Sequence, residues 1–224
     1  MWVRIPPAAP IPDPIPITCI AMPPDVTACL DLRDRVDAYV YLLGMYLGDG
    51  MLTRGPRDVW RLRVSLDRRY PDIVERCEWA IRQVGERTAG RVPRPGCWEI
   101  YSNWKHWRCA FPQHAPGPKH QRSIRLEPWQ RQLVAAYPGE LVRGLIHSDG
   151  CRALNRVWRT WADTKHLYTY PRYFFSNRSP EIRAIFMSAC EAIGVESRPN
   201  NRYSISVARR GSVALLEGLV GPKR

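Results

Sequence analysis

Two aspartates in matching sequence contexts are the residues of this chain best suited to chemistry. Asp49 belongs to the decapeptide Y-L-L-G-M-Y-L-G-D-G at residues 41–50, and Asp149 belongs to L-V-R-G-L-I-H-S-D-G at residues 141–150. Each Asp-Gly pair ends a mostly apolar helical pattern, where the helix dipole disfavours a negative charge. Two carboxylates brought together there repel unless a divalent cation lies between them. Mg²⁺ (or Mn²⁺) fits such a pair and supports phosphodiester hydrolysis.

Small residues in the same decapeptides indicate how the two aspartates are brought together. Gly44 and Gly48 lie four residues apart, as do Gly144 and Ser148. Glycine inside a helix costs roughly 1 kcal/mol relative to alanine, so two such stripes indicate a close helix–helix contact. If the helices pack in parallel through these stripes, the two aspartates converge.

The decapeptides are part of a longer internal repeat. In both halves a Pro-acid pair opens an amphipathic helix, and strand-like segments precede and follow that helix. The paired segments are helices at residues 70–85 and 179–194, and strands at 59–66 and 168–176, then 97–102 and 202–207. This order predicts an α+β fold of two pseudo-symmetric αββαββα repeats, with helices on one face of antiparallel sheets.

The repeat divides the chain into three segments. Residues 1–33 are expected to form a proline-rich leader that is extended or disordered. Residues 34–139 hold the first repeat and a linker, and residues 140–224 hold the second repeat.

Composition indicates the class of partner. The chain has 224 residues, a net charge of +13 and 45% apolar residues. These values exclude a coiled coil or a wholly disordered chain and favour a nucleic acid as partner. The longest mostly apolar run, residues 38–48, is too short to span a membrane.

The two decapeptides resemble the paired motifs of the LAGLIDADG homing endonucleases, in the monomeric two-repeat form, and the resemblance covers residues 36–222. In that family the motif helices form a pseudo-dyad interface, their last acids bind the catalytic metal, and saddle-shaped sheets cover the DNA. The resemblance implies a metal-dependent, site-specific double-strand DNA endonuclease that needs no obligate protein partner. Asp49 and Asp149 take the positions of the metal ligands. Leu47 and His147 depart from the family pattern at a variable position that is not a ligand.

The family also places basic residues near the metal, where a late strand passes into the next helix. Lys105 and Arg210 take that position here, with a role in supporting the transition state or activating water. Lys119 and Lys223 are the competing candidates, and an ordinary solvated charge is an equally open interpretation of each.

DNA contacts are expected on the outward faces of the hairpins, where arginine suits guanine edges and phosphates. The candidates are Arg54, Arg57, Arg61 and Arg63 on the first hairpin, and Arg152, Arg156, Arg159, Lys165 and Arg172 on the second. The alternative is a charged sheet face without specificity. No contact is assigned to the nearby aromatics Trp158, Trp161, Tyr168 and Tyr170, because aromatics at strand spacing are usually core.

A non-catalytic DNA-binding transcription regulator is the competing function. LAGLIDADG domains resemble parts of some bacterial regulators and of intron maturases. A descendant that only binds DNA is free to lose its metal-binding acids, whereas Asp49 and Asp149 are both present.

Seven cysteines at irregular spacing, with no signal peptide before them, predict reduced thiols in a cytoplasmic protein. One series has a metal-like composition: Cys97, Cys109, His114 and His120. It lacks a C-x-x-C pair, so buried thiols beside loop histidines are favoured over zinc. His106 is expected to be a bystander and His147 a packed interface residue.

Overall fold

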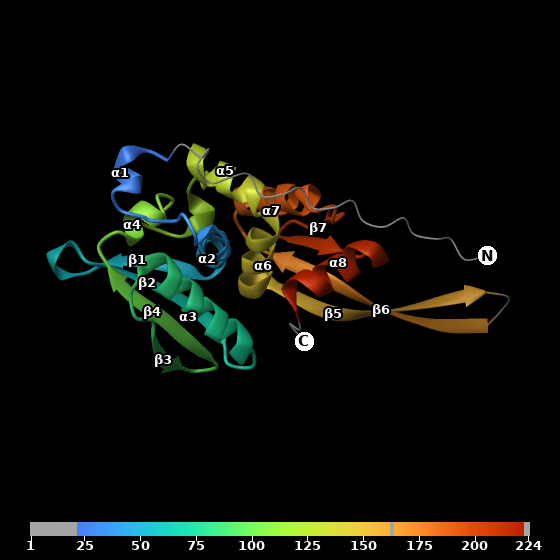
Figure 1. Cartoon of the computed structure of the whole chain (residues 1–224). Coiled ribbons are helices and arrows are strands. Elements are labelled where there is room, and N and C mark those ends of the chain that lie inside the picture. The colour runs from blue at the N-terminus through green and yellow to red at the C-terminus, as the bar shows by residue number, and fades with distance from the viewer. Residues whose placement is uncertain (1–21, 162–163, 222–224) are drawn as a thin grey trace.

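The computed structural model describes residues 22–161 and 164–221, which form two similar halves around a central pair of helices (Figure 1). The first half contains α2 (Val36–Gly48), β1 (Gly50–Arg54), β2 (Trp60–Asp67), α3 (Pro71–Gly85), β3 (Gly90–Arg94), β4 (Cys97–Trp104) and α4 (Trp107–Ala110). The second contains α6 (Pro138–Asp149), β5 (Gly150–Trp161), β6 (Thr164–Ser176), α7 (Pro180–Ala192), β7 (Arg198–Asn201), β8 (Ser204–Val207) and α8 (Arg210–Val220). The predicted α+β architecture of two αββαββα repeats is therefore confirmed.

The short elements outside the repeats are α1 (Pro24–Thr27), α5 (Pro128–Ala136) and two 3₁₀ turns, Pro56–Asp58 and Lys119–Gln121. Helix α5 lies in the segment that links the halves. Its start is fixed by a capping box between Glu127 and Gln130, and by Pro128 in the first turn.

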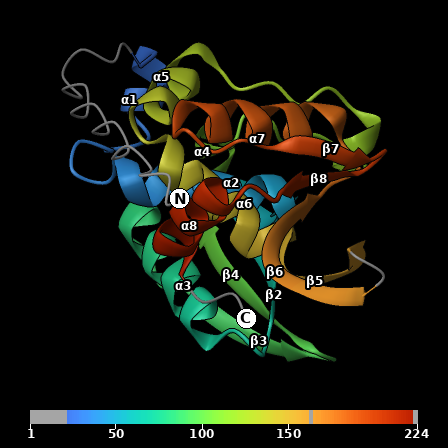
Figure 2. The same cartoon turned by 90° about the vertical axis from the view of Figure 1, so that its right-hand side faces the viewer.

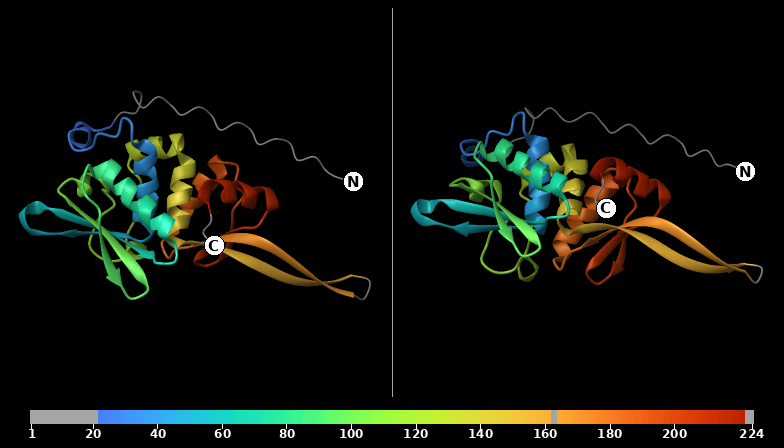
Figure 3. Two further views of the ribbon diagram at one scale, coloured as in Figure 1. Left: turned by 60° about the horizontal axis from the view of Figure 1, so that its bottom comes forward. Right: turned by 90° about the horizontal axis from the view of Figure 1, so that it is seen from below.

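Each half has one four-stranded antiparallel sheet. The strand orders are β1-β2-β4-β3 and β5-β6-β8-β7, so the two sheets have the same topology. The alternation expected in β2 is present, because Leu62 and Val64 are fully buried while Arg61 and Arg63 face the other side. We call the side away from the buried residues the open face. Figure 3 shows the sheets extending to opposite sides of the α2–α6 pair.

The β5–β6 hairpin is longer than its counterpart in the first half. Strand β6 begins at Thr164, four residues before the start expected from the sequence. The added part is exposed, so no burial pattern marks it in the sequence. Figure 2 shows this hairpin curving away from α7 and α8.

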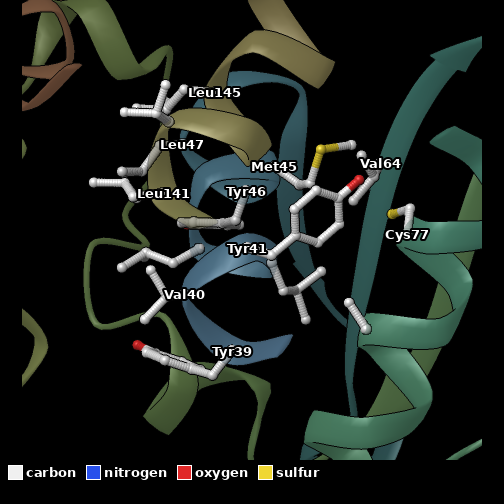
Figure 4. Close-up of a cluster of buried hydrophobic side chains, with 14 of the residues drawn as sticks. Tyr39, Val40, Tyr41, Met45, Tyr46, Leu47, Val64, Cys77, Leu141 and Leu145 are labelled. Carbon is white, nitrogen blue, oxygen red and sulfur yellow. The ribbon is translucent and has the colours of Figure 1, made fainter. Parts of the chain in front are cut away.

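Helix α2 is buried almost all round because it lies between α6, α3 and the first sheet. Figure 4 shows Tyr41 and Met45 of α2 near Val64 of β2 and Cys77 of α3. At the start of the helix, the Tyr39 hydroxyl donates to the carbonyl of Ala110 at 2.9 Å. The apolar decapeptide pattern thus places α2 in the centre of the core.

The leader is shorter than the sequence indicated. Residues 1–21 lie outside the described part of the chain, but residues 22–33 contain α1 and pack on the core. Leu30 and Leu32 are 3% and 2% exposed. The prediction of an extended or disordered segment is therefore wrong for residues 22–33, where apolar side chains resume after the prolines. The other segment boundaries stay predictions.

No helix within residues 22–161 and 164–221 has both the length and the apolar character needed to cross a membrane.

Candidate active site at the ends of the paired helices

Helices α2 and α6 touch through their small residues and run in parallel. A Cβ atom added to Gly44 would lie 2.8 Å from the Leu141 carbonyl oxygen, and one added to Gly144 would lie 2.2 Å from the Tyr41 carbonyl oxygen. One turn further on, a Cβ atom on Gly48 would meet the Ser148 hydroxyl. Contacts that advance together along both helices require parallel packing, so both helices end at the same place.

A hydrogen-bond chain through His147 joins these helices to α8. Its Nε2 lies 2.9 Å from the carbonyl oxygen of Val220, which can only accept, so Nε2 carries the proton. In the neutral ring with this tautomer, Nδ1 accepts from the Tyr41 hydroxyl at 3.0 Å. His147 is 7% exposed. The structure therefore places His147 in the interface between α2, α6 and α8. It does not line the cleft described in the next paragraph.

Asp49 and Asp149 line one cleft of about 760 Å³ at the shared helix end. Asp49 is exposed and Asp149 is partly buried. The Asp149 carboxylate lies over Gly48, since a Cβ atom there would be 3.2 Å from Asp149 Oδ2. Asn177, in the turn after β6, donates to the same oxygen at 2.5 Å. The structure thus gathers the two predicted metal ligands and adds an amide that orients one of them.

Lys119 reaches the same cleft from the linker. Its Nζ donates to the carbonyl oxygens of Gly48 at 2.8 Å and Leu47 at 3.1 Å, and also to that of Tyr46. These carbonyls end α2 and have no partner within the helix, and a cation there complements the helix dipole. Burial lowers the pKa of Lys119 from 10.5 to about 8, although the charges of Asp149 and Asp49 act in the opposite direction.

Lys105 and Arg210 do not line this cleft, which corrects their assignment to catalysis. Gly50 and Ile100 both pair with Val64, whereas Trp104 lies four residues further along β4. At about 3.3 Å per residue, the end of β4 is about 13 Å from that level, and Lys105 follows it. Lys105 instead lines a second cleft.

Arg210 is the exposed first residue of α8, and the preceding Arg209 pairs with Glu196 at 2.5 Å. Lys223, the other competing candidate, lies outside the described residues. The sequence offered four basic candidates for a role beside the metal. Among those in the described part of the chain, Lys119 is the one that lies beside the aspartates.

On the first hairpin, two of the four predicted arginines face the open side of the sheet. Arg61 lies over the Tyr101 ring at 3.9 Å from its centroid, and Arg63 is 3.9 Å from a Glu99 oxygen. Arg54 pairs in register with buried Trp60 and so belongs to the opposite face.

Arg54 also forms an ion pair with Asp58 at 2.9 Å. Arg57 lies in the turn of the hairpin with a φ of 55°, exposed to solvent. Neither residue contributes to the open face, so their predicted placement on it is wrong, and their contact with DNA stays a prediction.

On the second hairpin, Arg159 and Arg172 lie on the open face and the other three candidates do not. Arg152 pairs in register with buried Tyr173, and it forms an ion pair with Glu217 of α8 at 2.6 Å. Because strand faces alternate with period two, Arg156 shares the face of Arg152. Lys165 pairs with residue 160, which also lies on that face. The predicted placement of Arg152, Arg156 and Lys165 on the outward face is therefore wrong, and their contact with DNA stays a prediction.

Exposed aromatics on the second open face were missed by sequence reasoning. Trp161 is 76% exposed and Tyr168 is 45% exposed, and Arg159 lies over the Tyr168 ring. Tyr170 accepts a hydrogen bond from Asn155 on the same face. Trp158 is also exposed but lies on the opposite face. These aromatics are not core because the hairpin extends beyond the helices that cover the sheet.

The cysteines of the described part are all thiols. The metal-like series expected from the sequence is not brought together. Cys97 begins β4, whereas Cys109 lies beyond the other end of that strand. Among the described residues, Cys109 instead approaches Cys29 and His106.

Solved structures with the same arrangement identify the fold. The N-terminal LAGLIDADG domain of DUF199/WhiA matches with a TM-score of 0.53, at 11% identity over 85% of this chain and 84% of that one. The LAGLIDADG meganuclease I-AabMI, bound to uncleaved DNA, matches at 0.51, with 9% identity over 81% and 82% of the two chains. The homing endonuclease I-WcaI, bound to its DNA recognition sequence, matches at 0.50, with 14% identity over 92% of each. No protein-family model and no curated protein sequence matches. The chain has a LAGLIDADG-like fold.

Proposed function

We propose that this protein is a monomeric, site-specific endonuclease that hydrolyses phosphodiester bonds of double-stranded DNA with a divalent metal. The observation that carries the proposal is the convergence of Asp49 and Asp149 in one cleft beside Lys119. The two carboxylates come from different halves of one chain, so a second copy is not needed to complete the site.

The donor set of the cleft fits Mg²⁺ or Mn²⁺. These ions take oxygen ligands, and Mg²⁺ is commonly held by one or two carboxylates with water and phosphate oxygens completing the shell. Asp49 and Asp149 would supply the carboxylates, and a cleft of about 760 Å³ leaves room for the rest. Bound there, the metal would polarise a phosphate oxygen and favour ionisation of a bound water.

The chain's own residues position and balance the charges of this reaction. Asn177 fixes the Asp149 carboxylate by donating to its Oδ2. Lys119 places a cation beside the aspartates, where negative charge develops as a phosphodiester is attacked. Its pKa of about 8 also makes proton transfer at Nζ easier near neutral pH than for an ordinary lysine.

The open faces of the two sheets are the proposed DNA-binding surface. They carry Arg61, Arg63, Arg159 and Arg172, and the net charge of +13 supports attraction to the phosphate backbone. A strand pair fits the major groove, where arginine pairs with guanine, so this surface would supply site specificity.

A DNA-binding regulator without catalysis is the second candidate. The similarity to the LAGLIDADG domain of DUF199/WhiA, at a TM-score of 0.53, favours it as a specific alternative. Both functions use the same open faces, but only the endonuclease needs the aspartate pair.

The deciding experiment is cleavage of a plasmid library, with randomised or host-locus inserts, in Mg²⁺ and in Mn²⁺. We expect double-strand cuts at one recurrent sequence, abolished by Asp49→Asn or Asp149→Asn with binding to that sequence retained. Asp34→Asn, an exposed aspartate before α2, is the matched control and should cut normally.

Two outcomes would contradict the endonuclease. Specific binding without cuts in either metal would assign the protein to the regulator class. Undiminished cutting by both aspartate variants would place the active site elsewhere.

A further inference from the structure

Three soft ligand groups meet at a place separate from the aspartate cleft. The ligand atoms of Cys29, His106 and Cys109 all lie within 4.8 Å of one another. Cys29 follows α1, His106 is the N-cap of α4, and Cys109 is the third residue of that helix. The Cys109 sulfur lies 4.0 Å from His106 Nδ1.

These separations are close to those of a tetrahedral zinc site. Zn–S bonds of about 2.3 Å and Zn–N bonds of about 2.0 Å place neighbouring ligand atoms roughly 3.5 to 3.8 Å apart. Side-chain movements of about 1 Å would close the cluster to that size. All three residues are partly buried, and the adjacent cleft, which His106 and Cys109 line, leaves space for a fourth ligand.

The local charges suit a zinc dithiolate. Two thiolates and one neutral imidazole balance the charge of Zn²⁺, so Lys105 and Arg108, which line the same cleft, do not oppose the ion. The Trp104 ring, edge-on to His106 at 5.1 Å, holds the imidazole in place.

We propose that Cys29, His106 and Cys109 bind a structural Zn²⁺ ion. Soft sulfur donors select zinc over the Mg²⁺ or Mn²⁺ that the carboxylates would take. The ion would tie the segment before α2 to the start of α4, two segments far apart in sequence. This inference stands apart from the proposed nuclease, since a regulator with the same fold would bind the ion equally.

The experiment is a titration of the full-length, metal-free, reduced protein with Co²⁺, followed by Zn²⁺. The background carries Asp49→Asn and Asp149→Asn, so that cobalt at the carboxylates does not contribute. We expect one equivalent of Co²⁺ with thiolate charge-transfer absorption and the intense visible bands of tetrahedral cobalt, displaced by one Zn²⁺. Cys29→Ser and Cys109→Ser should each remove the charge-transfer band or bring it to about half intensity. Cys97→Ser and Cys151→Ser are the control variants and should leave it unchanged.

A second measurement tests the proposal without the cysteine variants, in case these fail to fold. Zn²⁺ should protect Cys29 and Cys109 of the same background protein from iodoacetamide, read by mass spectrometry of peptides, while exposed Cys151 reacts at an unchanged rate. Circular dichroism should show that the protein is folded in both states. Folded, reduced protein that shows neither the cobalt bands nor protection would overturn the proposal. So would a Cys29–Cys109 disulfide that persists in reductant and takes up no metal.

Discussion

The surroundings of Lys119 act on the charge of its side chain in two opposing ways. Three carbonyl oxygens of α2 and two nearby aspartates favour its charge, while burial disfavours it more strongly. Such a balance is common where a side chain has a catalytic task, because the task requires a pKa away from its ordinary value. The folded protein therefore holds this proton less tightly than the unfolded chain does.

This difference in proton affinity between the folded and unfolded states should make the free energy of unfolding depend on pH. Between about pH 8 and 10.5 the unfolded state binds more protons at Lys119, so the free energy of unfolding contributed by this residue rises with pH. Relative to Lys119→Met, the wild type should gain up to about 3 kcal/mol across that window. Urea unfolding of both proteins at a series of pH values measures the gain.

Lys105→Met, which replaces an exposed lysine of the same half, is the control for the loss of one lysine side chain. Parallel stability curves for the wild type and Lys119→Met would contradict the lowered pKa of Lys119.

At the scale of elements, the alternation of side chains between the two faces of a strand decides which basic residues lie on the proposed DNA-binding surface. Arg156 and Arg159 are both exposed on β5, three residues apart, and they face opposite sides of the hairpin. Arg159 lies on the open face above the Tyr168 ring.

Arg159→Ala should therefore weaken binding to the specific target at least about fivefold, the lower end of what a base contact contributes. Arg156→Ala, with the same loss of charge, should weaken it about threefold or less. Fluorescence anisotropy without divalent metal measures both. Equal losses would mean that both side chains contact phosphates only, and that the open face does not define the binding surface.

The helices and strands also show which parts of the structure could be predicted from the sequence. The order of helices and strands follows from local periodicity and from the repeat, so it was predictable. The error at Lys105 arose because a motif alignment does not show which end of β4 lies beside Gly50; strand register decides that. The proximity of Cys29 to His106 could not be predicted either, because Cys29 lies in a segment that was expected to be disordered.

For the whole molecule, the glycine contact between α2 and α6 is the joint between the halves. A methyl group on Gly144 would lie 2.2 Å from the Tyr41 carbonyl, and backbone cannot move aside without separating the helices. Gly144→Ala should lower the free energy of unfolding by about 3 kcal/mol. Thermal or urea unfolding measures the loss.

Gly218→Ala is the matched control, because Gly218 is also helical but has open space where the methyl group would go. That variant should be stabilised by up to about 1 kcal/mol through helix propensity. A neutral Gly144→Ala would mean that the halves are joined elsewhere.

The unequal hairpins would give the protein a direction along the DNA duplex that it is proposed to bind. Strands β5 and β6 have 12 and 13 residues, whereas β1 and β2 have 5 and 8. At about 3.4 Å per residue, the longer hairpin spans about 40 Å, comparable to a dozen base-pair steps, against about 17 to 27 Å for the shorter one. If the protein reads DNA as proposed, its recognition sequence should therefore not be palindromic. We expect most of its information to lie on the flank that the longer hairpin contacts, so inverting that flank should weaken binding more than inverting the other.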